Sequence, residues 1–258
     1  MHNLLGGNTS FRDPEVSPEG PKTTAELPAD IARRNRELVE RYADELYDAP
    51  ADAILAWAHE HAPGPVAVTL SMENTVLAEL AEKHLPRADF LFLDTEYHFP
   101  ETIEVADRVE KRYASHRLVR AKAQLSRAQQ DEVYGPNLYL RNPTACCRMR
   151  KVEPLAVGLS PYVGWVTGLR RADGPTRAEA PALSLDNTGR LKISPLVTWS
   201  LEDTDAYIED NDLIVHPLTR QGYPSIGCAT CTLPVAEGED PRAGRWAFSA
   251  KTECGLHG

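Results

Sequence analysis

This chain has no long hydrophobic run, and its first half contains no cysteine. No apolar stretch approaches the roughly 20 residues that a membrane-spanning helix needs. The first 28 residues are rich in proline, glycine and acids, and they have no apolar core of the kind found in a secretory signal. We therefore expect a protein that makes no contact with a membrane and has a cytoplasmic location.

A surplus of positive charge is also missing. The 258 residues include 38 acids and 28 lysines and arginines, so the formal net charge is -10 and the sequence pI about 5.3. This balance argues against a general nucleic-acid binder. The basic residues still gather in groups, which suits one small anionic ligand; solvated surface charge is the alternative for any single side chain. The groups are Arg141, Arg148, Arg150 and Lys151; Arg170, Arg171 and Arg177; and Arg242 and Arg245.

The middle of the chain alternates between short apolar runs and helical patterns. This alternation predicts an α/β fold with a doubly wound, mostly parallel sheet. Ligands of such sheets bind beyond the carboxyl ends of the strands, so Ser71–Asn74, Asp94–Thr95 and Gly168–Arg171 should share one rim. The predicted strands are Val66–Leu70, Phe90–Leu93, Arg117–Val119 and Tyr162–Thr167. The predicted helices are one capped by Asp30 that runs through Leu46, Ala51–His59, Glu73–His84, Glu101–Tyr113, and one capped by Ser200 that runs to Asp210.

Composition divides the chain into three parts. Residues 1–28 show little periodicity and are interpreted as a flexible arm, whereas residues 29–215 carry the α/β pattern. Residues 216–258 are rich in glycine, proline and threonine and hold three of the five cysteines. The sequence identifies no apolar face for self-association, so both a monomer and a homo-oligomer stay open.

The cysteines indicate a metal centre. Their odd number, one adjacent pair and a reducing compartment argue against a disulfide framework. Cys228-Ala229-Thr230-Cys231 is a CxxC turn, which by itself is typical of a zinc or redox site. Cys146 and Cys147 are neighbours whose side chains point apart, so they suit different corners of a polynuclear cluster better than one tetrahedral zinc. The four thiols together favour a [4Fe–4S] cluster over zinc.

Cys254 is the fifth cysteine and lies four residues from the C-terminus. Lys251 and His257 supply positive charge that favours its thiolate, and Gly255 and Gly258 give the segment backbone freedom. A nucleophile on such a segment can enter a pocket, react, and turn to a second partner. An inert terminal thiol is the alternative.

Three motifs complete the pattern: Cys146-Cys147-Arg148-Met149-Arg150-Lys151, Gly227-Cys228-Ala229-Thr230-Cys231 and Lys251-Thr252-Glu253-Cys254-Gly255-Leu256-His257. Together they resemble the iron–sulfur type of assimilatory adenylyl-sulfate (APS) reductases, within the PAPS reductase family. The likeness runs from about Pro65 to the C-terminus and includes Leu93-Asp94-Thr95, Tyr97-His98-Phe99 and Trp165–Arg171. It implies a sheet of the adenine-nucleotide α-hydrolase (PP-loop) type, a reductase domain at 29–215, and a segment at 216–258 that carries the CxxC and the catalytic cysteine.

The resemblance also implies a reaction. Cys254 would attack the sulfur of adenosine 5′-phosphosulfate, release AMP, and carry a sulfo group until reduced thioredoxin liberates sulfite. Lys151, Arg242, Arg245 and His257 would contact the phosphosulfate and balance its charge. The [4Fe–4S] cluster would be electrostatic and structural, because the two electrons come from the thioredoxin dithiol.

Further site residues are implied by the same resemblance. The phosphate-binding turn would be Thr69–Asn74 with Ser71, and Lys151, one helical turn beyond Cys147, would connect cluster and substrate. The turn lacks the glycine of its relatives, and Glu96 replaces a glycine that often follows Leu-Asp-Thr. The expected adenosine contacts are the backbone of Leu93 and Gly168, and the loop beside the phosphates would hold Arg170, Arg171 and Arg177.

Three alternatives stay open. Enzymes that reduce 3′-phosphoadenylyl sulfate (PAPS) generally resemble this chain but lack the four cluster cysteines. An ATP pyrophosphatase that thiolates RNA would need an SGGxDS-like loop, which Ser71–Asn74 matches poorly. A cluster-based redox sensor would leave Cys254, Lys251 and His257 without a purpose.

Overall fold

The computed structural model describes residues 26–249, 251 and 253–256. The predicted arm therefore lies almost wholly outside the described residues. The helices are α1 (Ala29–Leu46), α2 (Ala51–His61), α3 (Val76–His84), α4 (Pro100–Arg112), α5 (Arg127–Tyr134), α6 (Leu138–Arg141), α7 (Pro143–Cys147), α8 (Glu153–Gly158) and α9 (Leu201–Asp210), with a π-helical turn η1 (Arg148–Val152) between α7 and α8. The strands are β1 (Val66–Leu70), β2 (Asp89–Asp94), β3 (Leu118–Lys122), β4 (Gly164–Val166), β5 (Leu183–Leu185) and β6 (Leu191–Ile193). Short 3-10 turns are η2 (Arg171–Asp173), η3 (Pro175–Arg177), η4 (Pro217–Gln221) and η5 (Ala229–Cys231).

The six strands form one sheet in the order β3-β2-β1-β4-β6-β5. All neighbours are parallel except the edge strand β5, which runs antiparallel to β6. Val68 of β1 pairs with Phe90 on one side and Val166 on the other. Successive strands are therefore added on one side of β1 first (β2 and β3) and on its other side later (β4 to β6). Ligands of such sheets bind where this change of side occurs, between β1 and β4. The predicted α/β class with a mostly parallel sheet is confirmed.

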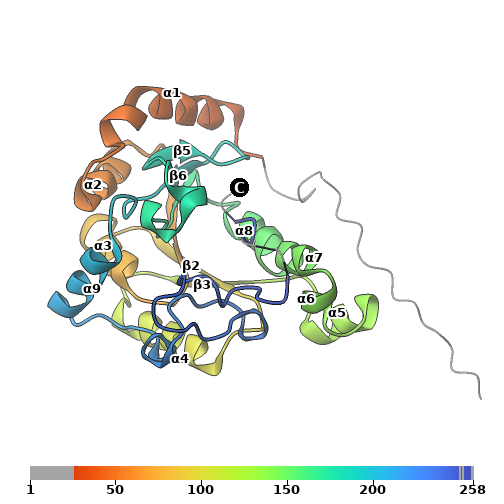
Figure 1. The fold of residues 1–258 in the computed structure, drawn as a ribbon. Coiled ribbons are helices and arrows are strands. Elements are labelled where there is room, and N and C mark those ends of the chain that lie inside the picture. Colours follow the sequence, from red (N-terminus) through yellow and green to blue (C-terminus); the bar gives the residue numbers. More distant parts are fainter. Residues whose placement is uncertain (1–25, 250, 252, 257–258) are drawn as a thin grey trace, which may run out of the picture.

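Helices cover both faces of the sheet (Figure 1), with α2, α3 and α9 on one side and α5 to α8 on the other. Alternate residues of β1 and β2 explain this arrangement. Val68 and Phe90 pack into the large core under α2, α3 and α4, whereas Ala67 and Leu91 pack against α8. A strand that is covered on both faces is apolar throughout, which is why both strands could be recognised in the sequence.

Several predicted boundaries needed correction. The first helix begins at Ala29 after Pro28, and Asp30 lies inside it, so the prediction of an Asp30 cap was wrong. The third helix begins at Val76, because the turn before it is held by hydrogen bonds from Thr75 N to the Ile214 carbonyl. Ser200 does cap α9, and it exchanges hydrogen bonds with Asp203 in a capping box.

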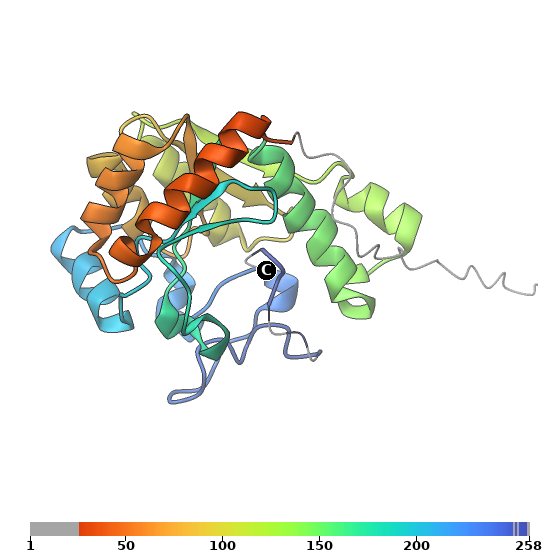
Figure 2. The same cartoon turned by 90° about the horizontal axis from the view of Figure 1, so that it is seen from above.

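The described residues from 216 onward lie mainly in loops. Figure 2 shows this segment, in blue, running along one edge of the molecule. It is attached to the sheet rim, because His216 N donates to the Glu73 carbonyl at 2.9 Å. Within the described part of the chain, no helix combines the length and apolarity needed to cross a bilayer.

Candidate active site at the sheet rim

The adjacent cysteines end a short capped helix. The Asn142 side chain accepts a hydrogen bond from Ala145 N at 2.9 Å, and Pro143 occupies the first turn, so α7 begins at a defined point and ends at Cys147. The chain then continues through the π-helical turn η1 into α8. A π turn inserts an extra residue into a helix and is often found at functional sites. Lys151 lies in this turn, and its side chain lines the same cavity as that of Cys147.

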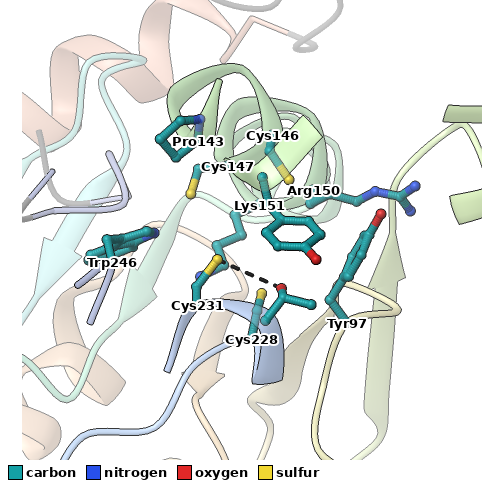
Figure 3. A pocket seen from close by; sticks show the side chains of 11 residues that line it. Tyr97, Pro143, Cys146, Cys147, Arg150, Lys151, Cys228, Cys231 and Trp246 are labelled. Carbon is teal, nitrogen blue, oxygen red and sulfur yellow. Dashed lines mark hydrogen bonds between the residues drawn. The ribbon is translucent and has the colours of Figure 1, made fainter. Parts of the chain in front are cut away.

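Four thiols line that cavity. Figure 3 shows Cys146 and Cys147 on the helix, with Cys228 and Cys231 on the facing loop. All four are buried and free of disulfide bonds. Among the described residues, no three cysteine, histidine or acidic side chains converge as ligands of a single metal ion. The other lining residues are Tyr97, Tyr139, Pro143, Arg150, Lys151, Thr230 and Trp246.

Backbone hydrogen bonds fix the CxxC turn. Cys231 N donates to the Cys228 carbonyl at 2.9 Å, and Trp246 N donates to the Cys231 carbonyl at 3.0 Å. Ala229 N donates to the Tyr97 carbonyl at 2.7 Å and so ties the turn to the loop after β2. These bonds fix the backbone that places the second pair of thiols opposite the first.

Burial opposes ionisation of three of these thiols, those of Cys146, Cys147 and Cys231. It raises the pKa of Cys146 to about 12, and the three other cysteines of the cavity add to this effect. Burial likewise raises the pKa of Cys231 to about 11 and raises that of Cys147. Thiolates gathered at this depth would repel one another, so the cavity is suited to a positively charged group that binds them together.

Lys151 is a buried cation at the edge of this cavity. Burial by itself lowers the pKa of its ammonium, but the negative charge of Cys228, Cys254 and Cys147 raises it more, and the net pKa lies above its ordinary value. Thr95, at the end of β2, places its hydroxyl 3.3 Å from Cys228 Sγ. Both groups can compensate negative charge on sulfur.

Cys254 packs against residues of the cysteine cavity. It is half-buried and contacts the group formed by Tyr97, Cys147, Cys228, Cys231 and Trp246. Beside it, Leu256 packs against the apolar core of α8. The predicted nucleophile therefore lies next to the cysteine cavity, on the side where Lys151 is buried.

Trp246 organises the basic residues of this region. The fully buried indole ring lies 4.8 Å from the Arg245 guanidinium carbon and 5.8 and 5.9 Å from Lys151 Nζ and Lys251 Nζ. Arg245 also donates to Ser225 Oγ at 3.0 Å. A Cβ at Gly227 would lie within 3 Å of the Arg245 guanidinium, so any larger residue before the CxxC turn would displace that side chain.

The other predicted basic residues separate into two groups. Arg177 and Arg242 both pair with Glu253, the neighbour of Cys254, at 3.0 and 3.3 Å. Arg170 pairs with Asp173 at 2.8 Å and donates to Thr204 Oγ1, also at 2.8 Å.

Arg171 points elsewhere. Its guanidinium donates to the Tyr47 carbonyl at 2.7 Å and stacks on the Tyr47 ring at 3.9 Å, between α1 and α2. The structure therefore does not bring Arg171 to the cysteine cavity.

The residues predicted to contact the nucleotide lie along one edge of the sheet, and their contact with the nucleotide stays a prediction. Ser71, Leu93 and Gly168 follow or end β1, β2 and β4, which are neighbours in the sheet. Ser71 is exposed, while the Leu93 carbonyl already lies 2.8 Å from His98 Nε2. His257 lies outside the described residues, so its predicted contact stays a prediction.

The two positions that depart from the relatives' pattern both have backbone conformations that favour glycine. Met72 in the phosphate turn has φ +66° and is buried, and Glu96 has φ +59°. Glu96 makes a compensating contact, since its carboxylate accepts from Arg150 Nη1 at 2.7 Å. Arg150 is 1% exposed and lines the cysteine cavity.

Sequence reasoning missed some residues of this site. Trp246, Tyr97 and Glu253 bear no charge pattern or spacing that separates them from core or surface residues. Glu96 did carry a signal, because a charged residue in place of glycine needs a partner to offset the strain.

Comparison with known proteins places the chain in a family. The sequence profile described as "Phosphoadenosine phosphosulfate reductase domain" matches residues 65–234. The chain belongs to this family. The match covers the whole sheet, the vicinal cysteines and the CxxC turn.

Curated members of the family are close in sequence. The adenosine 5′-phosphosulfate reductase of Mycolicibacterium smegmatis is 51% identical over 223 residues, which are 86% of this chain and 94% of the relative. The enzyme of the same name from Streptomyces coelicolor is 48% identical over 238 residues, 92% of this chain and 97% of the relative. That of Mycobacterium tuberculosis is 48% identical over 240 residues, with 86% and 94% covered.

Solved structures share the fold. The phosphoadenylyl-sulfate reductase of Candida auris has a TM-score of 0.62 at 24% identity and covers 82% of this chain and 100% of its own. The FMN adenylyltransferase of Candida glabrata has a TM-score of 0.52 at 14% identity, with 83% and 79% covered. At this identity the likeness concerns the fold, and it agrees with the adenine-nucleotide type of sheet.

Proposed function

We propose that this protein reduces adenosine 5′-phosphosulfate to sulfite and AMP, with Cys254 as the nucleophile and reduced thioredoxin as the electron donor. The observation that carries the proposal is the position of Cys254, which is half-buried against the four-cysteine cavity. It lies close enough to Lys151 to raise the pKa of the lysine. Relatives that are 48% to 51% identical bear the name adenosine 5′-phosphosulfate reductase. The reaction is one step of sulfate assimilation and leads to cysteine biosynthesis.

In the first step the Cys254 thiolate attacks the sulfate sulfur. The bond between sulfur and the bridging oxygen breaks, AMP leaves with the electron pair, and the sulfo group stays on Cys254 Sγ. An anion approaches an anion in this step, and the leaving phosphate gains charge. Fixed cations counter both effects, each by roughly 2 to 4 kcal/mol in the transition state.

In the second step a thioredoxin thiolate attacks Cys254 Sγ. Sulfite leaves with the electron pair of the S–S bond, and a mixed disulfide forms. The second thioredoxin thiol then releases Cys254, so the dithiol supplies both electrons. Reducing, cytoplasmic surroundings are where such a donor would act.

Lys151, Arg242 and Arg245 are the proposed contacts of the phosphosulfate, together with His257. Lys151 and Arg245 both face the Trp246 ring, and Arg242 pairs with the residue before Cys254. The nucleotide would lie along the rim formed by Ser71, Leu93 and Gly168, and Arg177 would complete its phosphate loop. Arg171 is left out, because it donates hydrogen bonds to Tyr47 and Asp48 in the loop between α1 and α2 and to the Ala180 carbonyl.

The cavity fits an iron–sulfur cluster. It offers four buried thiols and no other metal-ligating side chain among the described residues that line it. Cys146, Cys147, Cys228 and Cys231 would hold a [4Fe–4S] cluster, with one thiolate for each iron. Such a cluster would supply the positive charge that the buried thiolates need and would set the electrostatics next to Lys151.

The test is an intact-mass measurement. Anaerobically purified protein is mixed with adenosine 5′-phosphosulfate and then separated from small molecules. Its intact mass is measured by mass spectrometry before and after reduced thioredoxin is added. We expect a gain of one SO₃ group, mapped to Cys254 and released by thioredoxin as sulfite. An adduct formed only from PAPS would support the proposed mechanism but show that the substrate is PAPS. No adduct from either nucleotide in cluster-replete protein would refute the reductase and favour a cluster-based sensor.

A further inference from the structure

The residue before Cys254 makes ion pairs that the proposed reaction does not use. Glu253 Oε1 accepts hydrogen bonds from Arg177 Nε at 3.2 Å and Nη2 at 3.0 Å, and Oε2 accepts from Arg242 Nη2 at 3.3 Å. The arginine side chains are 11% and 22% exposed and that of Glu253 is 31% exposed. Partial removal from water makes these charge-assisted bonds stronger than an ordinary surface pair.

The same contacts attach the chain end to the body of the protein. Arg177 ends η3, which follows β4, whereas Arg242 belongs to the loop between the CxxC turn and Trp246. On the other side of Cys254, Leu256 packs on the apolar core of α8. The backbone around Cys254 is therefore held by charge on one side and by apolar contact on the other.

The local charge favours an anion of higher charge than a carboxylate. Asp173 accepts from Arg170 at 2.8 Å and from Arg177 at 3.2 Å. Arg177 and Arg242 thus share the single carboxylate of Glu253, and Arg245 lies close enough to Arg242 for their positive charges to repel each other. A phosphosulfate, with about two negative charges, would attract these guanidinium groups more strongly than the single charge of Glu253 does.

We propose that Glu253 is a positioning residue: its carboxylate occupies Arg177 and Arg242 in the substrate-free protein and yields them to the phosphosulfate of the incoming substrate. The inference rests on the proposed function, because it takes Arg242 as a phosphosulfate contact. Before substrate binds, Glu253 holds the Cys254 segment in place. Once the anion takes over the two arginines, the segment is released at Glu253, and Cys254 can follow the sulfur and later meet thioredoxin.

Two variants with opposite changes of charge test this exchange. In the cluster-replete protein, Glu253→Gln and Arg177→Gln each break the contact, so each should speed alkylation of Cys254 by iodoacetamide about fivefold. AMP affinity should move in opposite directions, about fivefold tighter for Glu253→Gln, which removes the competing carboxylate, and weaker for Arg177→Gln. Glu237→Gln removes an exposed acid of the same segment and is the matched control for both measurements.

Alkylation is followed by peptide mapping and AMP binding by calorimetry. Arg177→Gln removes a cation, which would slow alkylation if the rate depended only on how well nearby charge stabilises the Cys254 thiolate. Faster alkylation in both variants would therefore be due to release of the segment. Alkylation of Glu253→Gln at the wild-type rate would overturn the docking role. AMP binding that weakens in both variants would overturn the exchange. Neither readout needs turnover, so an absent sulfo adduct in the wild type, or absent AMP binding, would refute the proposed function while the alkylation rates still decide the role of Glu253.

Discussion

The cysteine cavity and the C-terminal segment touch each other but are held in different ways. The four cavity cysteines are 7% to 9% exposed, and backbone hydrogen bonds between Cys228, Cys231 and Trp246 fix the CxxC turn. Cys254 is half-buried, and its segment is attached through the Glu253 ion pairs and the contact of Leu256.

This difference suits two kinds of chemistry. Buried backbone hydrogen bonds do not exchange easily, because breaking one leaves polar groups unsatisfied. Ion pairs that are only partly removed from water, such as those of Glu253, exchange more readily with an anion that competes for the cation. The cavity is therefore suited to hold a group permanently, and the segment is suited to a nucleophile that must meet two partners in turn.

Removal of the nucleophile should have the largest effect. Cys254→Ser should lower sulfite production at least about a thousandfold, because the hydroxyl is a far poorer nucleophile than the thiolate. Iron content, visible absorbance and thermal stability should match the wild type, since the serine keeps the packing of the segment. A variant that lost its iron together with its activity would contradict the division between the two regions.

Removal of a cavity thiol should break the other region. Cys231→Ser should lose most of the iron, lower the melting temperature by several degrees, and reduce sulfite production by about a hundredfold or more, because metal binding is coupled to folding. Iron analysis and thermal unfolding measure this loss. Retention of full iron content would contradict the proposed ligand set.

Lys151 lies between the two regions and should show an intermediate effect. Lys151→Ala should reduce kcat/KM about a hundredfold, as expected for one fixed cation at a reacting anion. It should also change the absorbance or the magnetic spectrum of the iron. Lys122→Ala, which removes an exposed cation from the same rim, is the control and should change neither. An unchanged spectrum and unchanged turnover in Lys151→Ala would show that this lysine does not connect the cluster to the substrate.

The smallest effect concerns the backbone strain at Glu96, which has a positive φ and pairs with Arg150 of the cavity. Glu96→Ala should lower the free energy of unfolding by about 2 kcal/mol, because it leaves the buried Arg150 unpaired. Glu96→Gly loses the same pair but relieves the positive φ, so its loss should be about 1 kcal/mol smaller. Urea unfolding measures both. Equal losses would show that the backbone at residue 96 stores no strain.

Much of this molecule could be predicted from sequence because its signals are local. The apolar runs of β1 and β2, and the Ser200 cap, depend on residues that lie close together in the chain. The helices between 123 and 160 were not predicted, although Ser126 and Gln129 form a capping box at the start of α5, because these helices are short and one is a π turn. The hairpin of β5 and β6 was missed for the same reason, as each strand has three residues.

The sequence by itself determined which residues are candidates for the chemistry: five cysteines and a set of cations whose spacing predicts a common site. It could not determine which cation meets which anion. Arg170, Arg171 and Arg177 look alike in sequence, yet Arg171 contacts Tyr47 while Arg177 contacts Glu253. Only the tertiary structure decided this, because a long side chain takes its partner from residues far away in the chain, and the packing of the backbone sets which of these lie within reach.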